Sequence, residues 1–194
     1  SDLRVIHSQL RARGCRSFVF LAGDSTLDNH DAAWVGDHVA QAVNGYEAIL
    51  APPCMRRDVC YWLNSVLQES MERATVCAIN TAVEESTVSQ RHGVLLEQDL
   101  FIRDHITEDD ILVVSVGGND IAQEPSCHTI VSAAFLTYCV PSSAISGGNA
   151  PGLGHFLDLF GDQVQAYIEQ LVSKRKPRKV LVCMLYYPDV HSRG

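Results

Sequence analysis

Four short apolar segments constrain the fold of this 194-residue chain more than any other feature. Each segment is rich in β-branched residues, is bounded by polar or turn residues, and is apolar throughout rather than at alternate positions. Such continuous hydrophobicity is typical of strands that are covered on both faces, as in a parallel sheet. The segments are Ser17–Ala22, Thr75–Asn80, Ile111–Val116 and Val180–Tyr186. We expect them to form one parallel sheet.

Helical patterns lie between the expected strands. Apolar residues recur with helical spacing over 34–43, 59–67, 88–106 and 156–171. Asn44-Gly45 is a stop signal for the first helix, and Asp58 is an N-cap for the second. The stretch 141–154 is rich in Pro, Ser and Gly and is expected to be a long surface loop. This alternation predicts one α/β domain, a three-layer α/β/α sandwich of flavodoxin-like type, with strand order 2-1-3-4.

Charge and composition exclude several classes of function. The net charge of −8 argues against nucleic acid as a partner, because phosphate binding is driven by clustered Lys and Arg. No apolar run approaches the roughly eighteen residues of a membrane span, and residues 1–4 do not resemble a signal peptide. The odd number of cysteines, seven, and the lack of a Cys-x-x-Cys pair favour a reduced, cytoplasmic setting. A secreted protein with a Cys54–Cys60 or Cys127–Cys139 disulfide remains the alternative.

A first chemical motif, Gly23-Asp24-Ser25-Thr26, directly follows the first expected strand. Ligands of open α/β sheets bind outside the carboxyl ends of the strands, so Ser25 would face the ligand crevice on a tight turn. A nearby helix N-terminus would favour negative charge on an attacking oxygen, which suits a nucleophile. The alternative interpretation is a turn that only caps the following helix.

A second motif, Gly117-Gly118-Asn119-Asp120, follows the third expected strand. The first and third strands are neighbours in the predicted order, so both motifs would open into one crevice. Gly118 allows the backbone to approach a ligand closely, and the Asn119 amide can donate a hydrogen bond to an oxyanion. The alternative interpretation is a simple turn with the asparagine in a left-handed conformation.

Together the two motifs resemble blocks I and III of the SGNH (GDSL) hydrolase superfamily, and Gly-Asp-Ser-Thr is similar to its rhamnogalacturonan acetylesterase branch. The segment 80–87, Asn-Thr-Ala-Val-Glu-Glu-Ser-Thr, resembles block II, with Glu85 at the position of the family's oxyanion glycine. The resemblance covers about residues 16–125 in motif order. It implies hydrolysis of a small-molecule or carbohydrate ester through an acyl-enzyme, without a cofactor or a metal.

The resemblance also implies a role for each matching residue. Ser25 would attack the ester carbonyl. The oxyanion would be bound by Asn119 and by the backbone N–H groups of Ser25 and Glu85. Asp24, Gly118 and Asp120 would support the two turns, and contact between Asp120 and the substrate stays open.

The chain departs from the family in its catalytic base. The family's fourth block, Asp-x-x-His, does not occur, although eight histidines are present. His30, His128 and His191 are the substitutes to consider, whereas the other five are expected on the surface or in packed positions. We expect residues 1–194 to be a single SGNH-like domain that is incomplete at its C-terminus. The last strand and the base would then come from further polypeptide, for which a second chain is one source.

Two other functions stay open. A non-catalytic relative would keep the crevice and bind an acylated or glycan ligand after loss of the base. A Mg²⁺-dependent phosphotransfer protein would use Asp24, Asp28 and Asp120 as ligands. The sequence contains neither the metal-ligand spacing of a zinc enzyme nor a phosphate-binding glycine loop.

Overall fold

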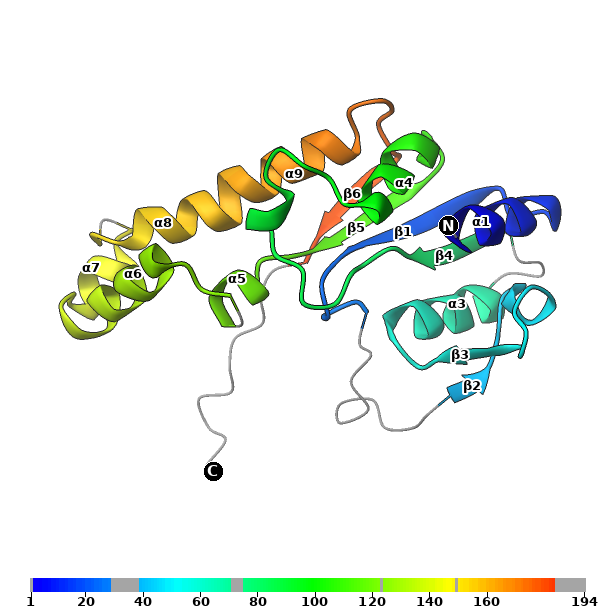
Figure 1. Cartoon of the computed structure of the whole chain (residues 1–194), viewed down its shortest axis with the longest axis horizontal. Coiled ribbons are helices and arrows are strands. Elements are labelled where there is room, and N and C mark those ends of the chain that lie inside the picture. The colour runs from blue at the N-terminus through cyan, green and yellow to red at the C-terminus, as the bar shows by residue number, and fades with distance from the viewer. Residues whose placement is uncertain (1, 29–38, 71–74, 123, 149, 184–194) are drawn as a thin grey trace.

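The computed structural model describes residues 2–28, 39–70, 75–122, 124–148 and 150–183. They form an α/β fold in which a four-stranded parallel sheet is flanked by helices (Figure 1). The sheet has the order β4-β1-β5-β6. Its strands are β1 (Ser17–Gly23), β4 (Val76–Asn80), β5 (Ile111–Ser115) and β6 (Lys179–Val182). A separate antiparallel pair is formed by β2 (Val39–Gln41) and β3 (Cys54–Arg56).

The helices divide into those that cover the sheet and those that extend beyond it. The former are α1 (Asp2–Ala12), α3 (Val59–Ser70), α4 (Glu97–His105) and α9 (Val164–Leu171). The latter are α5 (Asn119–Ala122), α6 (Cys127–Tyr138), α7 (Ser142–Ser146) and α8 (Leu153–Leu157). A π-helical segment, η3 (Asp158–Gln163), joins α8 to α9. Short 3-10 turns are η1 (Tyr46–Ala48) and η2 (Ser89–Arg91).

The predicted parallel sheet and its strand order are confirmed. The fourth predicted segment forms a strand up to Val182, and its residues 184–186 lie outside the described residues. β1 pairs in parallel with both β4 and β5, so that Leu21 lies opposite Asn80 and Gly23 lies opposite Ser115. The carboxyl ends of three neighbouring strands therefore meet at one edge of the sheet. The segments that follow these strands carry the candidate site.

The two faces of β1 belong to different parts of the core. Phe18, Phe20 and Ala22 are fully buried and pack with residues of α1, α4 and α9. Val19 and Leu21 point to the opposite face, where they pack with residues of α3. The alternation along one buried strand accounts for its continuous hydrophobicity and gives three layers, helix, sheet and helix (Figure 1).

The helix predicted over 34–43 is wrong for its described part. Residues 39–41 form strand β2, whereas 34–38 lie outside the described residues. Ala40 is buried between the exposed Val39 and Gln41, a period-two pattern that fits a strand with one covered face. The apolar spacing was compatible with both structures, and pairing with Cys54–Arg56 selects the strand.

The second predicted helix is confirmed as α3, but the orientation of its apolar face is wrong. The Tyr61 N–H donates to Asp58 Oδ1 at 2.8 Å, so Asp58 does cap the first turn. However, Trp62 and Val66 are exposed, and the fully covered side carries Cys60 and Asn64. This side faces the outer edge of β4, whose backbone groups require polar partners.

The remaining helix predictions are confirmed in part. The third pattern, 88–106, yields η2 and then α4, which begins only at Glu97. The fourth, 156–171, is continuous helical structure through α8, η3 and α9. The surface loop expected over 141–154 is wrong in part, because it contains α7 and the start of α8. The sequence reading did not identify α1 or α6.

Two further expectations concern the environment of the chain. Within the described ranges, no helix is both long and apolar enough to cross a membrane. All seven cysteines are among the described residues and carry free thiols, so neither the Cys54–Cys60 nor the Cys127–Cys139 bond is present.

Candidate active site

The Gly-Asp-Ser motif forms a tight turn at the end of β1. Asp24 is buried, and its Oδ1 accepts hydrogen bonds from the N–H of Thr26 at 3.0 Å and from its hydroxyl at 2.8 Å. The Asp24 carbonyl accepts from the N–H groups of Leu27 and Asp28. These bonds place Ser25 at the first corner of the turn, where its side chain is partly exposed.

Gly23 fits this position because no side chain would fit there. A Cβ atom at residue 23 would lie 2.0 Å from the carbonyl oxygen of Ser115 on the neighbouring strand. The Thr26 hydroxyl lies 2.7 Å from the Ser115 hydroxyl, which ties the serine turn to the end of β5. The close approach of two strands therefore explains the glycine of the Gly-Asp-Ser string.

The block II segment, residues 80–87, folds back onto the serine turn. The Asn80 amide donates to the Leu27 carbonyl at 3.1 Å, and the Thr81 hydroxyl donates to the Leu21 carbonyl at 2.6 Å. The Val83 N–H donates to the Gly23 carbonyl at 2.9 Å. The segment is thus attached to β1 before the turn that carries Ser25 and to Leu27 after it.

Glu85 has a backbone conformation that favours glycine. Its φ angle is 62°, in the left-handed region that L-residues other than Asn and Asp seldom adopt. Its side chain is exposed. Glu85 stands where the resembling motif has glycine, so the backbone retains the glycine-like turn although the residue type differs.

Asn119 connects the second motif, Gly117-Gly118-Asn119-Asp120, to the block II segment. It begins α5, is 6% exposed, and its amide nitrogen donates to the Ser86 carbonyl at 3.0 Å. One of the two amide hydrogens is thereby used, and the second remains for another acceptor. The structure therefore brings Ser25, Glu85 and Asn119 to the same edge of the sheet, on segments that contact one another.

Asp120 and the glycines before it support this arrangement. Asp120 is buried, with Oδ2 accepting from the Val88 N–H at 2.8 Å and Oδ1 accepting from the N–H and the hydroxyl of Ser89. Gly117 has φ of 103°, and a Cβ there would lie 2.7 Å from the Phe160 ring. Gly118 lies between it and Asn119, and its carbonyl accepts from the N–H groups of Ile121 and Ala122. The bonds from Val88 and Ser89 show that Asp120 caps η2, while the two glycines precede α5.

The geometry does not favour a magnesium site built from the three aspartates. Asp120 is engaged by η2, and Asp24 Oδ1 is engaged by Thr26. Across the described ranges, no group of three or more His, Cys, Asp or Glu side chains is arranged to hold a metal ion.

The histidines of the described segments lie away from Ser25 or make other contacts. His7 packs 4.5 Å from the Phe18 ring and 5.2 Å from His105, near the start of β1 and hence at the opposite edge of the sheet. The rings of His128 and His155 contact each other in a tilted arrangement, with centroids 4.3 Å apart. His92 is exposed after η2. His30, His38 and His191 lie outside the described residues.

The Ser25 hydroxyl forms no hydrogen bond with any residue that the structure describes. A groove of about 520 Å³ adjoins its turn. The groove lies between the turn and the exposed side of α3, and its apolar lining includes Leu27, Trp62 and Val66. The apolar spacing over 59–67 places Trp62 and Val66 on the apolar face of a predicted helix, so the sequence did not indicate this groove.

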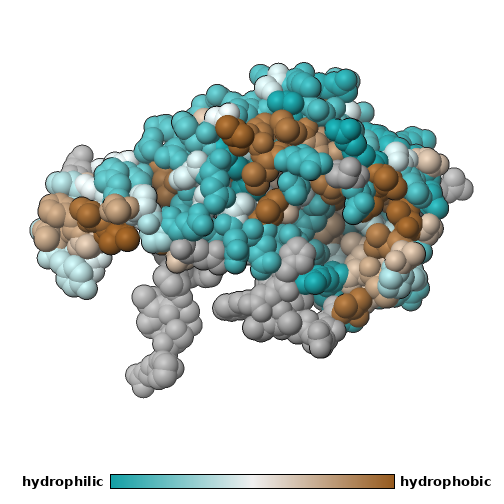
Figure 2. Space-filling view, in the orientation of Figure 1, coloured by the Kyte–Doolittle hydropathy of each residue, from teal (hydrophilic) through white to brown (hydrophobic). Residues whose placement is uncertain are grey.

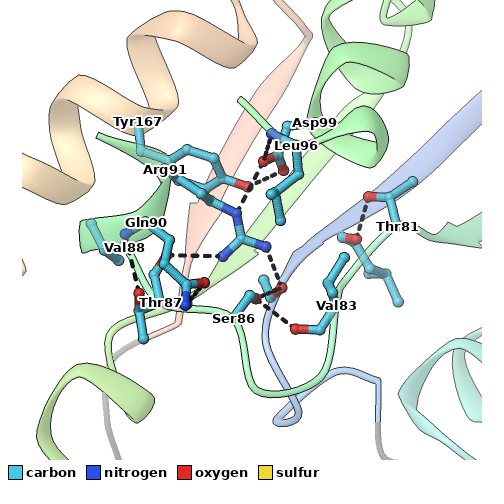
Figure 3. A network of polar contacts seen from close by, with 12 residues as sticks. Thr81, Val83, Ser86, Thr87, Val88, Gln90, Arg91, Leu96, Asp99 and Tyr167 are labelled. Atoms are coloured by element: carbon cyan, nitrogen blue, oxygen red, sulfur yellow. Dashed lines mark hydrogen bonds and ion pairs between the residues drawn. The ribbon is translucent and has the colours of Figure 1, made fainter. Parts of the chain in front are cut away.

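Sequence reasoning also missed a buried ionic cluster beneath the site, formed by Arg91, Asp99 and Tyr167 (Figure 3). Arg91 Nε lies 3.0 Å from Asp99 Oδ2, and both side chains are completely inaccessible. Tyr167 donates to Asp99 Oδ1 at 2.6 Å. Burial, followed by the nearby Asp99 charge, raises the pKa of Tyr167 well above its ordinary value, so the phenol remains a donor.

Comparison with known proteins gives only distant structural likenesses. No family model and no curated protein matches the chain. One similar structure is the W215I variant of Axe2, an acetyl xylan esterase from Geobacillus stearothermophilus, with 14% identity and a TM-score of 0.43. Another is LAE5, an alpha/beta hydrolase from the metagenome of Lake Arreo, Spain, with 14% identity and a TM-score of 0.36.

The matches cover 87% and 81% of this chain, respectively. The chain spans 60% of the length of the Axe2 variant and 75% of that of LAE5. Likenesses of this size do not transfer the activity of either protein to this chain.

Proposed function

We propose that this chain is a serine-dependent hydrolase of carboxylic esters, with Ser25 as the nucleophile. The observation that carries the proposal is the attachment of three segments at one sheet edge. Asn119 donates to the Ser86 carbonyl, next to the left-handed Glu85, and Val83 donates to Gly23, two residues before Ser25. A nucleophile and oxyanion donors require this kind of fixed proximity.

In the proposed reaction, Ser25 Oγ attacks the ester carbonyl carbon and its proton passes to a base. The negative charge that develops on the carbonyl oxygen is stabilised by the Asn119 amide and by the N–H groups of Ser25 and Glu85. Expulsion of the alcohol, which takes up the proton, leaves an acyl-enzyme that water hydrolyses. The groove beside Trp62 would hold one substituent of a small-molecule or carbohydrate ester.

The base is proposed to lie outside the described residues. His30 and His191 are the candidates in this chain, and a second polypeptide is the other source. Single variants His30→Ala and His191→Ala distinguish these sources. A large loss of Ser25 reactivity in one variant would identify the base, whereas unchanged reactivity in both would favour a base from another polypeptide.

A fluorophosphonate probe tests the nucleophile, because it labels only an activated serine. We expect one label per chain, located by mass spectrometry on Ser25 and absent in Ser25→Ala. Asn119→Ala should slow labelling by about a hundred- to a thousandfold, the usual cost of one oxyanion donor. Ser142→Ala, at an exposed serine in α7, is the control and should label like the parent protein.

A second candidate is a non-catalytic protein that binds an acylated or glycan ligand in the same crevice. One observation favours it, namely that no described histidine contacts the Ser25 hydroxyl. A correctly folded protein that the probe does not label, but that an ester or a glycan stabilises against heat, would support this candidate and contradict the hydrolase.

A further inference from the structure

The carbonyl of Gly23 is the point at which the serine turn joins the rest of the site. Gly23 ends β1, directly before Asp24 and Ser25. Its oxygen accepts from the Val83 N–H at 2.9 Å, from Arg91 Nη2 at 2.9 Å and from the Ser86 hydroxyl at 3.4 Å. The guanidinium is the charged donor among these three, and charge-assisted hydrogen bonds are about twice as strong as neutral ones.

Arg91 also contacts the end of the block II segment. Its Nη1 lies 3.5 Å from the Thr87 carbonyl, while Nε is paired with Asp99 (Figure 3). The planar guanidinium thus faces the carbonyl before the nucleophile on one side and a carbonyl after Glu85 on another. A rigid fork of donors fixes the distance between such acceptors, which a flexible ammonium does not do.

Asp99 and Tyr167 fix the orientation of the Arg91 guanidinium. Asp99 is fully buried and accepts from Arg91 Nε, from the Leu96 N–H at 3.1 Å and from the Tyr167 hydroxyl. The Tyr167 ring lies 5.3 Å from the guanidinium carbon. α4 and α9 therefore hold Arg91 in one position beneath the serine turn.

Stability alone does not explain this cluster. Removing two charges from water costs about as much as their attraction returns, and well-packed neutral replacements are often as stable. The geometric result is specific, however, because the two segments that would form the oxyanion site are bonded to one guanidinium. We propose that Arg91 is a positioning residue that holds the Ser25 turn and the Glu85 turn in their relative positions.

This inference rests on the proposed hydrolase function for its kinetic consequence. If Arg91 positions the two turns, its loss slows the covalent step and leaves binding of the probe nearly unchanged. The matched pair of variants is Arg91→Met/Asp99→Asn and Tyr167→Phe. The first removes both charges together and so leaves no unpaired buried ion, whereas the second weakens the same cluster but keeps the Arg91–Gly23 bond.

The first measurement separates the limiting rate of fluorophosphonate labelling from the half-saturating probe concentration. For Arg91→Met/Asp99→Asn, the limiting rate should fall about ten- to a hundredfold, the scale of a small misplacement of reacting groups. The half-saturating concentration should change less than about threefold, and Tyr167→Phe should retain both values within about threefold. Arg91→Lys is a second, milder variant. Its limiting labelling rate should lie between that of Arg91→Met/Asp99→Asn and that of Tyr167→Phe. An equal loss in Tyr167→Phe, or no loss in the double variant, would overturn the proposal.

A second measurement does not depend on activity. Backbone hydrogen exchange, followed by NMR, should become faster for residues 24–27 and 83–86 together in Arg91→Met/Asp99→Asn and Arg91→Lys, but not in Tyr167→Phe. Absence of labelling in the parent protein would refute the hydrolase, and the exchange result would still decide the role of Arg91. Unchanged exchange in both segments would exclude that role.

Discussion

At the scale of single residues, the block II segment has a left-handed backbone turn at Glu85, a residue type that seldom adopts this conformation. Glu85 has a φ of 62° and an exposed side chain, so its left-handed conformation is imposed by its neighbours. These neighbours are fixed by Val83 and Ser86, which bond to Gly23, and by Asn119, which bonds to Ser86. The proposed oxyanion role requires only the N–H of Glu85, which glycine also has.

Replacing Glu85 by glycine is therefore expected to be tolerated. Relief of the left-handed strain, on the order of 1 kcal/mol, offsets the greater flexibility of glycine in the unfolded chain. Glu85→Gly should change the free energy of unfolding by less than about 1 kcal/mol and keep or raise the rate of Ser25 labelling. Urea denaturation and probe labelling measure the two effects. Glu84→Gly is the control: residue 84 has no positive φ, so glycine relieves no strain there and this variant should be less stable than the parent protein. A large loss of labelling in Glu85→Gly would show that the Glu85 carboxylate has a role.

His7 provides a second residue-scale prediction, on pH. Burial, with the charges of His105 and Arg11, lowers the pKa of His7 from 6.5 to about 4. The unfolded chain binds this proton below pH 6.5 whereas the folded chain does not, so stability falls as the pH is lowered from 6.5 towards 4.

His7→Phe should remove this component of the acid sensitivity. The loss of unfolding free energy between pH 7 and pH 5 should be smaller in His7→Phe by about 1 kcal/mol, roughly half of the full linkage value because the ring is only half-buried. Urea midpoints at the two pH values measure it. His92→Gln, at an exposed histidine, is the control substitution. A His7→Phe protein as acid-sensitive as the parent would refute the assignment.

At the scale of elements, side chains of α3 and of residues 44–46 protect the outer edge of β4. The Ala78 N–H donates to Asn64 Oδ1 at 2.9 Å, and the Ala78 carbonyl accepts from Asn64 Nδ2 at 3.0 Å and from the Tyr46 hydroxyl at 2.7 Å. The Asn44 amide donates to the Val76 carbonyl at 2.9 Å. On its outer side, where no further strand pairs with it in the described part of the chain, β4 is thus covered by side-chain amide and hydroxyl groups that bond to its backbone.

Asn64→Leu should be strongly destabilising although leucine is a better helix former. It would leave the buried Ala78 N–H and the Asn44 amide without one partner each, at about 1–3 kcal/mol per group. We expect a loss of about 2–4 kcal/mol in the free energy of unfolding, measured by urea denaturation. Ser65→Ala, on the next position of α3, should lose less than about 1 kcal/mol. A stable Asn64→Leu protein would show that water or relaxation satisfies the edge.

These elements also show what the sequence can predict. The four strands and their order followed from continuous hydrophobicity, because burial on both faces leaves that signature in each segment by itself. The side of α3 that faces the sheet was not predictable, since Asn64 is buried for a backbone partner fourteen positions away. Arg91, Asp99 and Tyr167 were missed for the same reason: their charges and phenol suggest surface positions until distant segments are brought together.

At the scale of the whole molecule, helices cover the strands of the sheet to different extents within the described ranges. α3 packs over β4 and β1, whereas Leu181 of β6 is 48% exposed and Val182 is 47% exposed. The prediction of a fifth strand beside β6 remains a prediction. The apolar side chains of α6 and α7 also lie open, at the end of the molecule where they gather in Figure 2.

The helical lobe formed by α6, α7 and α8 lies beside the sheet rather than on it (Figure 1). Residues 127–157 contain no Asp, Glu, Lys or Arg, so charge pairs do not hold the lobe. The buried residues of α6 are Thr129 and Ser132, whereas Ile130, Val131 and Phe135 are exposed. Local opening of the lobe therefore exposes little new apolar surface, and the free energy of this opening should be low.

The last prediction is that this lobe opens without unfolding of the sheet. Native-state hydrogen exchange should show α6 amides opening at a few kcal/mol, nearly independent of low denaturant concentrations, while β1 and β5 amides exchange only through global unfolding, on the order of 5–15 kcal/mol. Asn64→Leu supplies the discriminating control, because it weakens the sheet edge and not the lobe. It should lower the protection of β1 and β4 and leave that of α6 unchanged. Equal protection of α6 and β1, falling together in Asn64→Leu, would show that lobe and sheet form one cooperative unit.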